Sequence, residues 1–383
     1  MKTGHFTRRR LIASLAMGSF VFSVSDPFSS FAKEIRKGKT SNRSDLLSYV
    51  DASGEKKAVT TLREWEIKRQ QILDGMQKAM GKLPGLTGLP AFNIEIIEKV
   101  KEADYTRLTL RFTAAEKEKV PAYLYIPEKK SKKKRYPAML ALHETDEIGK
   151  MSVDGKGHNP NLAYAKELAQ RGYVVIAPDY PGFGDLKGYD FTNDTYESGT
   201  MKSIFDNIRC IDFLQSREDV DPDRIGVIGH SLGGHNALFT AAFDTRLKVI
   251  ISSCGWTIMD FYNAGEDVTK RYGGRLGPWA QDRYMPLLRE KYKLDPKKIP
   301  FDFSDVIAAL APRAFFSNSP VNDGNFAVAG VRKGIEDVSE VYRFLGAEDK
   351  LELRYPNSQH DFPTEVREEA YCFINKIFGV AHT

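Results

Sequence analysis

Short apolar runs alternate with helical patterns over most of residues 137–378. The runs are four to six residues long and do not alternate regularly between apolar and polar side chains. Strands that are apolar on both faces are typical of a parallel sheet covered by helices on both sides. We expect such strands at residues 138–142, 173–177, 224–228, 247–252, 314–317 and 351–355. The spacing of apolar residues predicts connecting helices at residues 161–171, 203–214, 235–243, 335–345 and 365–378.

The first third of the chain has two other patterns. Apolar residues recur at helical spacing over residues 45–80, which predicts a helical extension. Residues 105–113 and 120–126 have the pattern of strands. We therefore expect a spacer and a helical extension in residues 33–100, followed in residues 101–383 by an α/β domain with a mostly parallel sheet of eight strands.

One interval is too long for this alternation. About 60 residues separate the strand that ends near Ser253 from the strand that begins near Arg313, and a crossover helix needs far fewer. An insertion at the carboxyl end of a parallel strand lies over the edge of the sheet where binding sites form. We expect residues 257–312 to form a cap or lid there. Its aromatic rings would either stack on a substrate or form the core of the cap.

The first 32 residues have the pattern of an export signal. The sequence Thr-Arg-Arg-Arg-Leu-Ile at residues 7–12 is similar to the twin-arginine signature, and residues 11–24 carry no charge. Small residues before Ala32 offer a cleavage site. We expect a signal peptide at residues 1–32 and a periplasmic or secreted bacterial protein without stable membrane insertion, because fourteen apolar residues span a bilayer poorly. The intact mass of the exported protein would test this.

Composition and charge narrow the function classes. The chain is 42% hydrophobic and 28% charged, as is usual for a folded soluble protein. Its net charge is +5, of which the first 32 residues contribute three charges, and this leaves no electrostatic case for nucleic-acid binding. The basic run at residues 129–135 lies between two predicted strands, so we interpret it as a solvated loop.

Cysteine and histidine spacing predicts neither a disulfide framework nor a metal site. Cys210, Cys254 and Cys372 are widely spaced and lie in apolar surroundings, so we expect three buried thiols. The pair His143–Glu144 lacks the second histidine of a metalloprotease motif, because Glu147 occupies that place. We expect no cofactor.

A serine between glycines stands at the junction of a predicted strand and a predicted helix. The sequence of residues 229–234 is Gly-His-Ser-Leu-Gly-Gly. Such a junction is typical of a nucleophile elbow, in which a strained turn lifts the serine hydroxyl clear of the sheet edge. Gly229 and Gly233 suit the close approach of strand and helix. Ser231 is therefore the candidate nucleophile.

A serine nucleophile needs a base that takes its proton and a carboxylate that orients this base. His360 follows the last predicted strand, and Asp323 follows the strand before it. Both lie at carboxyl ends of strands, on the same edge as Ser231, although either could be an ordinary loop residue. Asp361 and Asp349 are the alternative acids. The first adjoins the base, and the second precedes the last strand at the opposite end.

Two backbone N–H groups are candidates for the oxyanion hole. One belongs to Leu232, directly after the serine, and the other to Thr145, in the loop that follows the strand at residues 138–142. Four further residues near these positions are candidates for a substrate pocket: His143, Glu144, His230 and Trp256.

Residues 105–378 resemble the α/β-hydrolase superfamily, in particular the branch of dienelactone hydrolases and acetyl xylan esterases. The resemblance rests on Gly-His-Ser-Leu-Gly-Gly, on Asp323 and His360, and on Asp-Tyr-Pro-Gly-Phe-Gly at residues 179–184. It implies an α/β-hydrolase fold with Ser231 as nucleophile, and a structural role for Asp179. Dienelactone hydrolases use cysteine as nucleophile, so the role of Glu144, which matches their Gln-Glu pair, stays open.

These features predict an exported serine esterase that works through an acyl-enzyme on a small-molecule or oligosaccharide ester, such as an esterified carbohydrate. One alternative is an exopeptidase similar to prolyl oligopeptidases. Those enzymes usually carry a β-propeller, and residues 33–100 are too few for one. A second alternative is an inactive binding protein on the same fold, which a fluorophosphonate would fail to label. The oligomeric state stays open.

Overall fold

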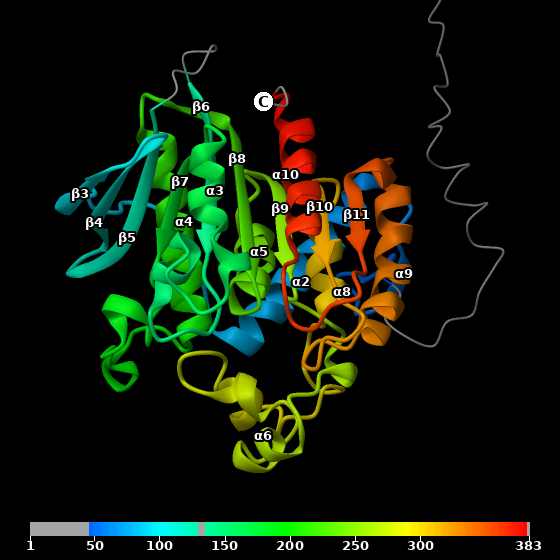
Figure 1. The fold of residues 1–383 in the computed structure, drawn as a ribbon. Helices are drawn as coiled ribbons and strands as arrows, with labels where there is room; N and C mark the ends of the chain where they lie inside the picture. The colour runs from blue at the N-terminus through cyan, green and yellow to red at the C-terminus, as the bar shows by residue number, and fades with distance from the viewer. Residues whose placement is uncertain (1–45, 129–134, 381–383) are drawn as a thin grey trace, which may run out of the picture. The chain divides into compact units, whose positions relative to one another are not determined.

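The computed structural model describes residues 46–128 and 135–380 (Figure 1). The predicted signal peptide, the spacer up to residue 44 and residues 129–134 of the basic run lie outside the described residues. Within the described ranges, every helix is too short or too polar to cross a membrane.

A mixed sheet of nine strands forms the centre of the fold, in the order β11-β10-β9-β8-β6-β7-β5-β4-β3. The strands from β6 to β11 pair in parallel, and the pairs β3–β4, β4–β5 and β5–β7 are antiparallel. This arrangement confirms the predicted fold class. The strands are β3 (Glu95–Lys101), β4 (Tyr105–Ala115), β5 (Glu118–Pro127), β6 (Tyr136–Leu142), β7 (Val174–Pro178), β8 (Val220–His230), β9 (Leu247–Ser253), β10 (Ala314–Asn318) and β11 (Leu351–Arg354).

The ninth strand, β3, is an edge strand that the sequence pattern did not reveal. It extends the sheet to Glu95, whereas we expected the domain to start at residue 101. Six of its seven residues are exposed, and Ile96 and Ile97 are both among them. Because neither face of β3 is buried, its sequence lacks the alternation that marks a half-buried strand.

Helices cover both faces of the sheet (Figure 1). Helices α3 (Tyr164–Gln170) and α10 (Thr364–Phe378) lie on one face, and α4 (Gly199–Ser216) and α5 (Leu232–Phe243) lie on the other. Helix α9 (Val328–Phe344) lies beside β11. A cluster of buried apolar side chains from the strands, α3 and α10 fills the space between them. This burial of apolar surface is the main stabilising contribution to the fold.

The N-terminal extension is only partly helical. Helix α2 (Leu62–Met80) begins with a capping box, in which Thr61 and Glu64 bond each other's backbone N–H groups. Residues before it form a hairpin of β1 (Ser48–Val50) and β2 (Lys56–Ala58), so the prediction of a helix from residue 45 was wrong there. The turn is favoured because the carboxylate of Asp51 accepts hydrogen bonds from the backbone of Ser53 and Glu55.

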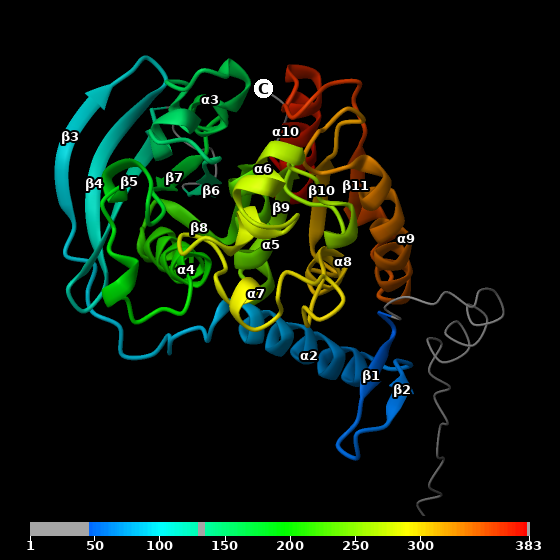
Figure 2. The same ribbon diagram turned by 90° about the horizontal axis from the view of Figure 1, so that it is seen from below.

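Much of the long interval between β9 and β10 lies over the carboxyl ends of the strands, and its last part packs against α5 and α9 before β10 begins. It contains the short helices α6 (Glu266–Arg271), α7 (Leu287–Glu290) and α8 (Phe303–Ala308). Helix α6 lies below the strand ends in Figure 1 and in front of β9 in Figure 2, which is the view onto that edge. We call residues 257–312 the cap.

Candidate active site

Ser231 occupies a strained turn between β8 and α5. Its φ of 53° and ψ of −116° are unfavourable for a residue with a side chain. Contacts on both sides hold this conformation. The Ser231 N–H donates to Ser253 O across 2.8 Å. A Cβ atom at Gly229 would lie 2.2 Å from Gly233 O, and one at Gly233 would lie 2.0 Å from Leu142 O. Only glycine fits at these two positions, so the turn has the geometry of a nucleophile elbow.

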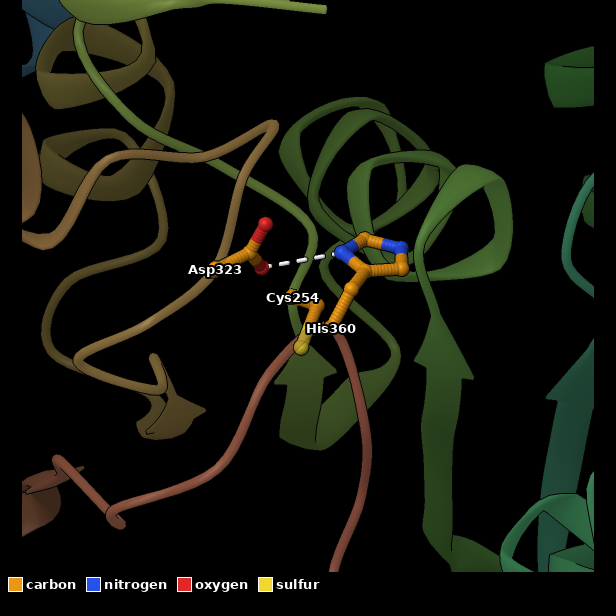
Figure 3. Close-up of side chains that lie close together, drawn as sticks. All are labelled: Cys254, Asp323 and His360. Carbon is orange, nitrogen blue, oxygen red and sulfur yellow. Dashed lines mark hydrogen bonds and ion pairs between the residues drawn. The ribbon is translucent and has the colours of Figure 1, made fainter.

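His360 and Asp323 form a hydrogen-bonded pair beside the elbow. The distance from His360 Nδ1 to Asp323 Oδ2 is 2.9 Å (Figure 3). The other carboxylate oxygen of Asp323 accepts hydrogen bonds from the backbone of Asn325 and Phe326, at 2.8 and 3.0 Å. Burial favours the neutral acid, but the contact with His360 and the two N–H donors outweigh it and lower the pKa of Asp323. The acid is therefore a carboxylate that fixes the orientation of the imidazole.

The two alternative acids have other places. The carboxylate of Asp361 accepts hydrogen bonds from the side chains of Asn159 and Asn161, at 2.9 and 2.7 Å. Asp349 lies in a short 3-10 helix directly before β11, at the opposite end of that strand from His360. Of these three carboxylates, Asp323 is the one that forms a hydrogen bond with His360.

Ser231 and His360 line one cavity of about 520 Å³. Four other residues predicted for the site line the same cavity: Leu232, Thr145, Glu144 and His230. The imidazole rings of His230 and His360 lie 4.9 Å apart between centroids. The structure thus brings together residues from loops that are far apart in the sequence. Their catalytic roles stay predictions from this geometry.

The two predicted oxyanion donors both have uncommitted N–H groups. In the described part of the chain, no group accepts a hydrogen bond from the backbone N–H of Leu232 or of Thr145. Leu232 is the first residue of α5, so the positive end of the helix dipole strengthens the attraction of its N–H group for an anion. Thr145 is the central residue of a turn that the Asp146 N–H closes on Glu144 O at 2.9 Å. Both donors suit a developing negative charge.

A buried polar network supports the loop that carries His360. The sequence pattern did not reveal this network. The side-chain amide of Asn318 donates to Ser253 Oγ and to Asp361 O, both at 2.8 Å. Ser253 Oγ also lies 2.9 Å from His230 Nδ1. Burial, and then the proximity of His360, hold the pKa of His230 well below its usual value. The signal was present as polar residues at the carboxyl ends of two otherwise apolar strands.

Cys254 lies beside the acid and base, within 4.8 Å of ligand atoms on Asp323 and His360 (Figure 3). Burial and the nearby Asp323 raise the pKa of its thiol well above the usual value, so the sulfur is a neutral thiol that donates to Asp361 O at 3.3 Å. His360 and Asp323 bond each other. Each of the three groups therefore has a hydrogen-bond partner within the site.

The predicted burial of three thiols is correct for Cys210 and Cys254 and wrong for Cys372. Cys372 lies on α10, where it is exposed although its neighbours Tyr371 and Phe373 are buried. The apolar neighbours face the sheet, and the helical turn places the thiol on the outer side.

The other predicted pocket residues divide into two groups. Glu144 lines the cavity, is 7% exposed, and accepts a hydrogen bond from Ser152 Oγ at 2.8 Å. Burial raises the pKa of Glu144. His143 and Trp256 lie outside the cavity lining, which corrects the prediction. Both are fully buried and bonded elsewhere, His143 to Tyr180 N–H and Trp256 to Ser317 Oγ.

Asp179, for which we expected a structural role, has a fully buried side chain. Its carboxylate accepts hydrogen bonds from Lys150 N at 2.7 Å, Lys150 Nζ at 2.5 Å and Asp185 N at 3.0 Å. These contacts tie together the loops after β6 and β7. Asp179 does not line the cavity.

The aromatic side chains of the cap serve both as its core and as the cavity wall. Trp279 is 8% exposed and packs against Tyr262, Phe303 and Phe326. Trp279 and Tyr262 also line the cavity. The rings therefore form the core of the cap, as one of the two alternatives predicted, and stacking on a substrate stays a prediction.

Comparison with known proteins gives matches over most of the chain. A family model described as the prolyl oligopeptidase family matches residues 161–295. The "Putative hydrolase YtaP" of Bacillus subtilis (strain 168) is 30% identical over 269 residues, which cover 68% of this chain and 84% of that protein. Carbohydrate esterase MZ0003, from an unknown prokaryotic organism, is 26% identical over 351 residues, 79% of this chain and 78% of that one.

A solved structure of similar fold is the glucuronoyl esterase from Solibacter usitatus. It superimposes with a TM-score of 0.65 at 20% identity, and the match covers 90% of this chain and 100% of that chain. At this identity the similarity bears on the fold alone.

Proposed function

Because this chain belongs to the α/β-hydrolase superfamily, we propose that Ser231, His360 and Asp323 hydrolyse carboxylic esters through an acyl-enzyme. The observation that carries the proposal is the His360–Asp323 hydrogen bond of 2.9 Å beside a strained serine in one cavity. Asp323 accepts from Nδ1, which leaves Nε2 of His360 free to take the proton of the serine hydroxyl.

The reaction proceeds in two halves. Ser231 Oγ attacks the ester carbonyl as its proton passes to His360, and the carbonyl oxygen becomes an oxyanion between the N–H groups of Leu232 and Thr145. Collapse of this intermediate breaks the bond to the alcohol, which takes the proton from His360. Water then attacks the acyl-enzyme by the same path and releases the acid. Asp323 stabilises the imidazolium in both halves because it stays a carboxylate.

We propose esterified carbohydrates as the substrate class. Support comes from the cavity wall, to which Trp279 and Tyr262 contribute aromatic surface of the kind that contacts the apolar face of a sugar ring. Further support comes from the relative named carbohydrate esterase, which matches 79% of this chain. A screen of acetylated, feruloylated and methyl-esterified sugars beside simple esters would identify the acyl group and the alcohol.

An exopeptidase is the second candidate, because the matched family model is that of prolyl oligopeptidases. The charge of the cavity argues against it. Arg271 and Arg283 line the cavity, and Glu144 is the one acidic residue of its lining. Burial raises the pKa of Glu144 and so favours its neutral form. Such a lining disfavours the charged amino terminus of a peptide. An aminoacyl-proline anilide that turned over faster than acetyl esters would favour the peptidase.

The proposal is tested by Ser231→Ala with p-nitrophenyl acetate as substrate. We expect kcat to fall by about 10⁴-fold or more, because the covalent step is lost. Ser339→Ala is the matched control, since that hydroxyl bonds Ile335 O within α9, and it should keep normal turnover. Retained turnover in Ser231→Ala would overturn the proposal. Failure of a fluorophosphonate to label the unmodified protein would favour an inactive binding protein.

A further inference from the structure

Tyr284 connects the cap to the loop after β6 that carries Thr145, which we call the oxyanion loop. Its hydroxyl shares a hydrogen bond with Thr145 Oγ1 at 3.0 Å, and both residues line the cavity. Thr145 is otherwise exposed, and within the described ranges its side chain forms no other hydrogen bond. The rotamer of Thr145 therefore depends on a residue that is 139 positions away in the sequence.

The backbone around Tyr284 is anchored on the start of α4. The Thr200 N–H donates to Tyr284 O at 3.1 Å, and the Gly199 N–H donates to Asp282 O at 2.9 Å. A Cβ atom at Gly199 would lie 2.5 Å from Arg283 O, so the two segments touch backbone to backbone. Helix α4 packs on the central sheet, and this contact makes Tyr284 part of the same rigid framework as the elbow.

We propose that Tyr284 is a positioning residue of the oxyanion hole, which acts on catalysis by fixing Thr145 through the hydrogen bond between their hydroxyls. This inference rests on the proposed ester hydrolysis. On this view the cap is a fixed part of the catalytic site, because one of its side chains orients the loop that supplies an oxyanion donor.

The proposed role has a kinetic signature. The Thr145 N–H meets negative charge only when the carbonyl oxygen becomes an oxyanion, so an error in its position affects the transition state more than the bound substrate. Loss of the Tyr284 hydroxyl should therefore lower kcat and leave KM nearly unchanged. A tyrosine that only contacts the substrate would instead change KM.

A double-mutant cycle separates action through Thr145 from direct action of Tyr284. The variants are Tyr284→Phe, which keeps the ring, Thr145→Val, which keeps the shape and the backbone N–H, and their combination. We expect each single variant to lower kcat for p-nitrophenyl acetate by about fivefold, the effect of one lost hydrogen bond. The double variant should lose no more than a single one, because both changes remove the same hydrogen bond. Thr145→Ser, which keeps the hydroxyl, should lose less kcat than Thr145→Val.

Tyr292→Phe is the matched control. Tyr292 also lies in the cap, but its hydroxyl donates to Lys78 O at 3.2 Å, on the side of α2, and it does not line the cavity. Its kcat should equal that of the unmodified protein. Should Tyr284→Phe fail to fold, the comparison of kcat between Thr145→Val and Thr145→Ser still tests whether the Thr145 hydroxyl contributes to catalysis. Both variants should fold, because Thr145 is an exposed loop residue.

Three results would overturn the inference: normal kcat in Tyr284→Phe or Thr145→Val, effects of the two variants that multiply to about 25-fold, or a change confined to KM. Failure of the proposed function gives a different pattern. If Ser231→Ala keeps turnover, the esterase proposal itself falls, whereas an inactive Ser231→Ala beside a normal Tyr284→Phe removes only the role of Tyr284.

Discussion

The elbow and the cap lie on the same edge of the sheet but are held in place by different kinds of contact. At the elbow, backbone meets backbone, and Gly229 and Gly233 leave no room for a single carbon atom. In the cap, residues 282–284 also meet α4 backbone to backbone, but other parts are held by side chains that reach back to backbone carbonyls. The guanidinium of Arg275 donates to Met259 O at 2.9 Å and also to the carbonyl of Asp260. A backbone contact at a glycine excludes every larger residue. A side-chain contact requires only that the side chain be long enough to reach its partner.

This difference explains why the reaction is easier to derive than the substrate. A glycine that must be glycine is visible in the sequence, so the candidate nucleophile and its strand could be located from Gly-His-Ser-Leu-Gly-Gly. The cap has no such constraint along most of residues 257–312. Its rings belong to a small core and to the cavity wall together, and the sequence does not separate these roles.

Gly233→Ala is the strongest way to break the elbow. A Cβ atom 2.0 Å from Leu142 O cannot be accommodated by a side-chain rotation, because the obstacle is backbone. We expect the free energy of unfolding to fall by about 3 kcal/mol and esterase turnover to be lost. Urea denaturation and hydrolysis of p-nitrophenyl acetate measure the two effects. Gly188→Ala is the control, since nothing lies within 4 Å of its Cβ position. Equal stability of both variants would contradict the account of the elbow.

Arg275→Lys tests the cap in the same way. Lysine keeps the charge but offers one ammonium group where the guanidinium now serves several carbonyls. We expect the free energy of unfolding to fall by about 1.5 kcal/mol in urea denaturation, less than for the elbow variant. Arg271→Lys is matched to it, because Arg271 is an exposed residue of the cap over the ring of Tyr272. A larger loss in Arg271→Lys would show that the cap is held differently.

Much of the central sheet was predictable because its strands are buried on both faces. Apolar runs of four to six residues located six of the nine strands of the sheet, and alternation located β4 and β5. Strand β3 escaped because its side chains are exposed on both faces. The hairpin before α2 differs from the predicted helix because the apolar spacing in residues 45–61 fits more than one structure, and the Asp51 carboxylate stabilises a turn there.

For the site, the order of residues along the chain indicated which ones lie at the same edge of the sheet. It did not indicate which side chains contact each other. Ser231, Asp323 and His360 could be proposed because each follows a strand end. His143 was a plausible pocket residue for the same reason, yet its ring turns into the core against Tyr180. The support from Asn318 and the contact of Tyr284 with Thr145 depend on distances between remote segments, which no local pattern encodes.

His235 lies at the contact between the two regions, and the effect predicted for it appears only as the pH falls. It belongs to the first turn of α5, and its ring lies 4.6 Å from that of Trp279 in the cap. Burial, and then the proximity of His360, lower the pKa of His235 to about 3. In the unfolded chain its pKa is about 6.5, so acid protonates the unfolded state first.

The stability that neutral His235 provides is therefore complete above pH 6.5 and declines as the pH falls toward 3. The expected slope is about 1.4 kcal/mol per pH unit for this one group. His235→Phe should remove that part of the slope in urea denaturation between pH 6.5 and 4.5, because phenylalanine suits the ring cluster and binds no proton. The exposed His158 is the control, and His158→Phe should keep the full slope. An unchanged slope in His235→Phe would mean that the His235 ring takes up a proton in the folded protein. The contact between α5 and the cap would then be less tightly packed than the contact between the elbow and β6.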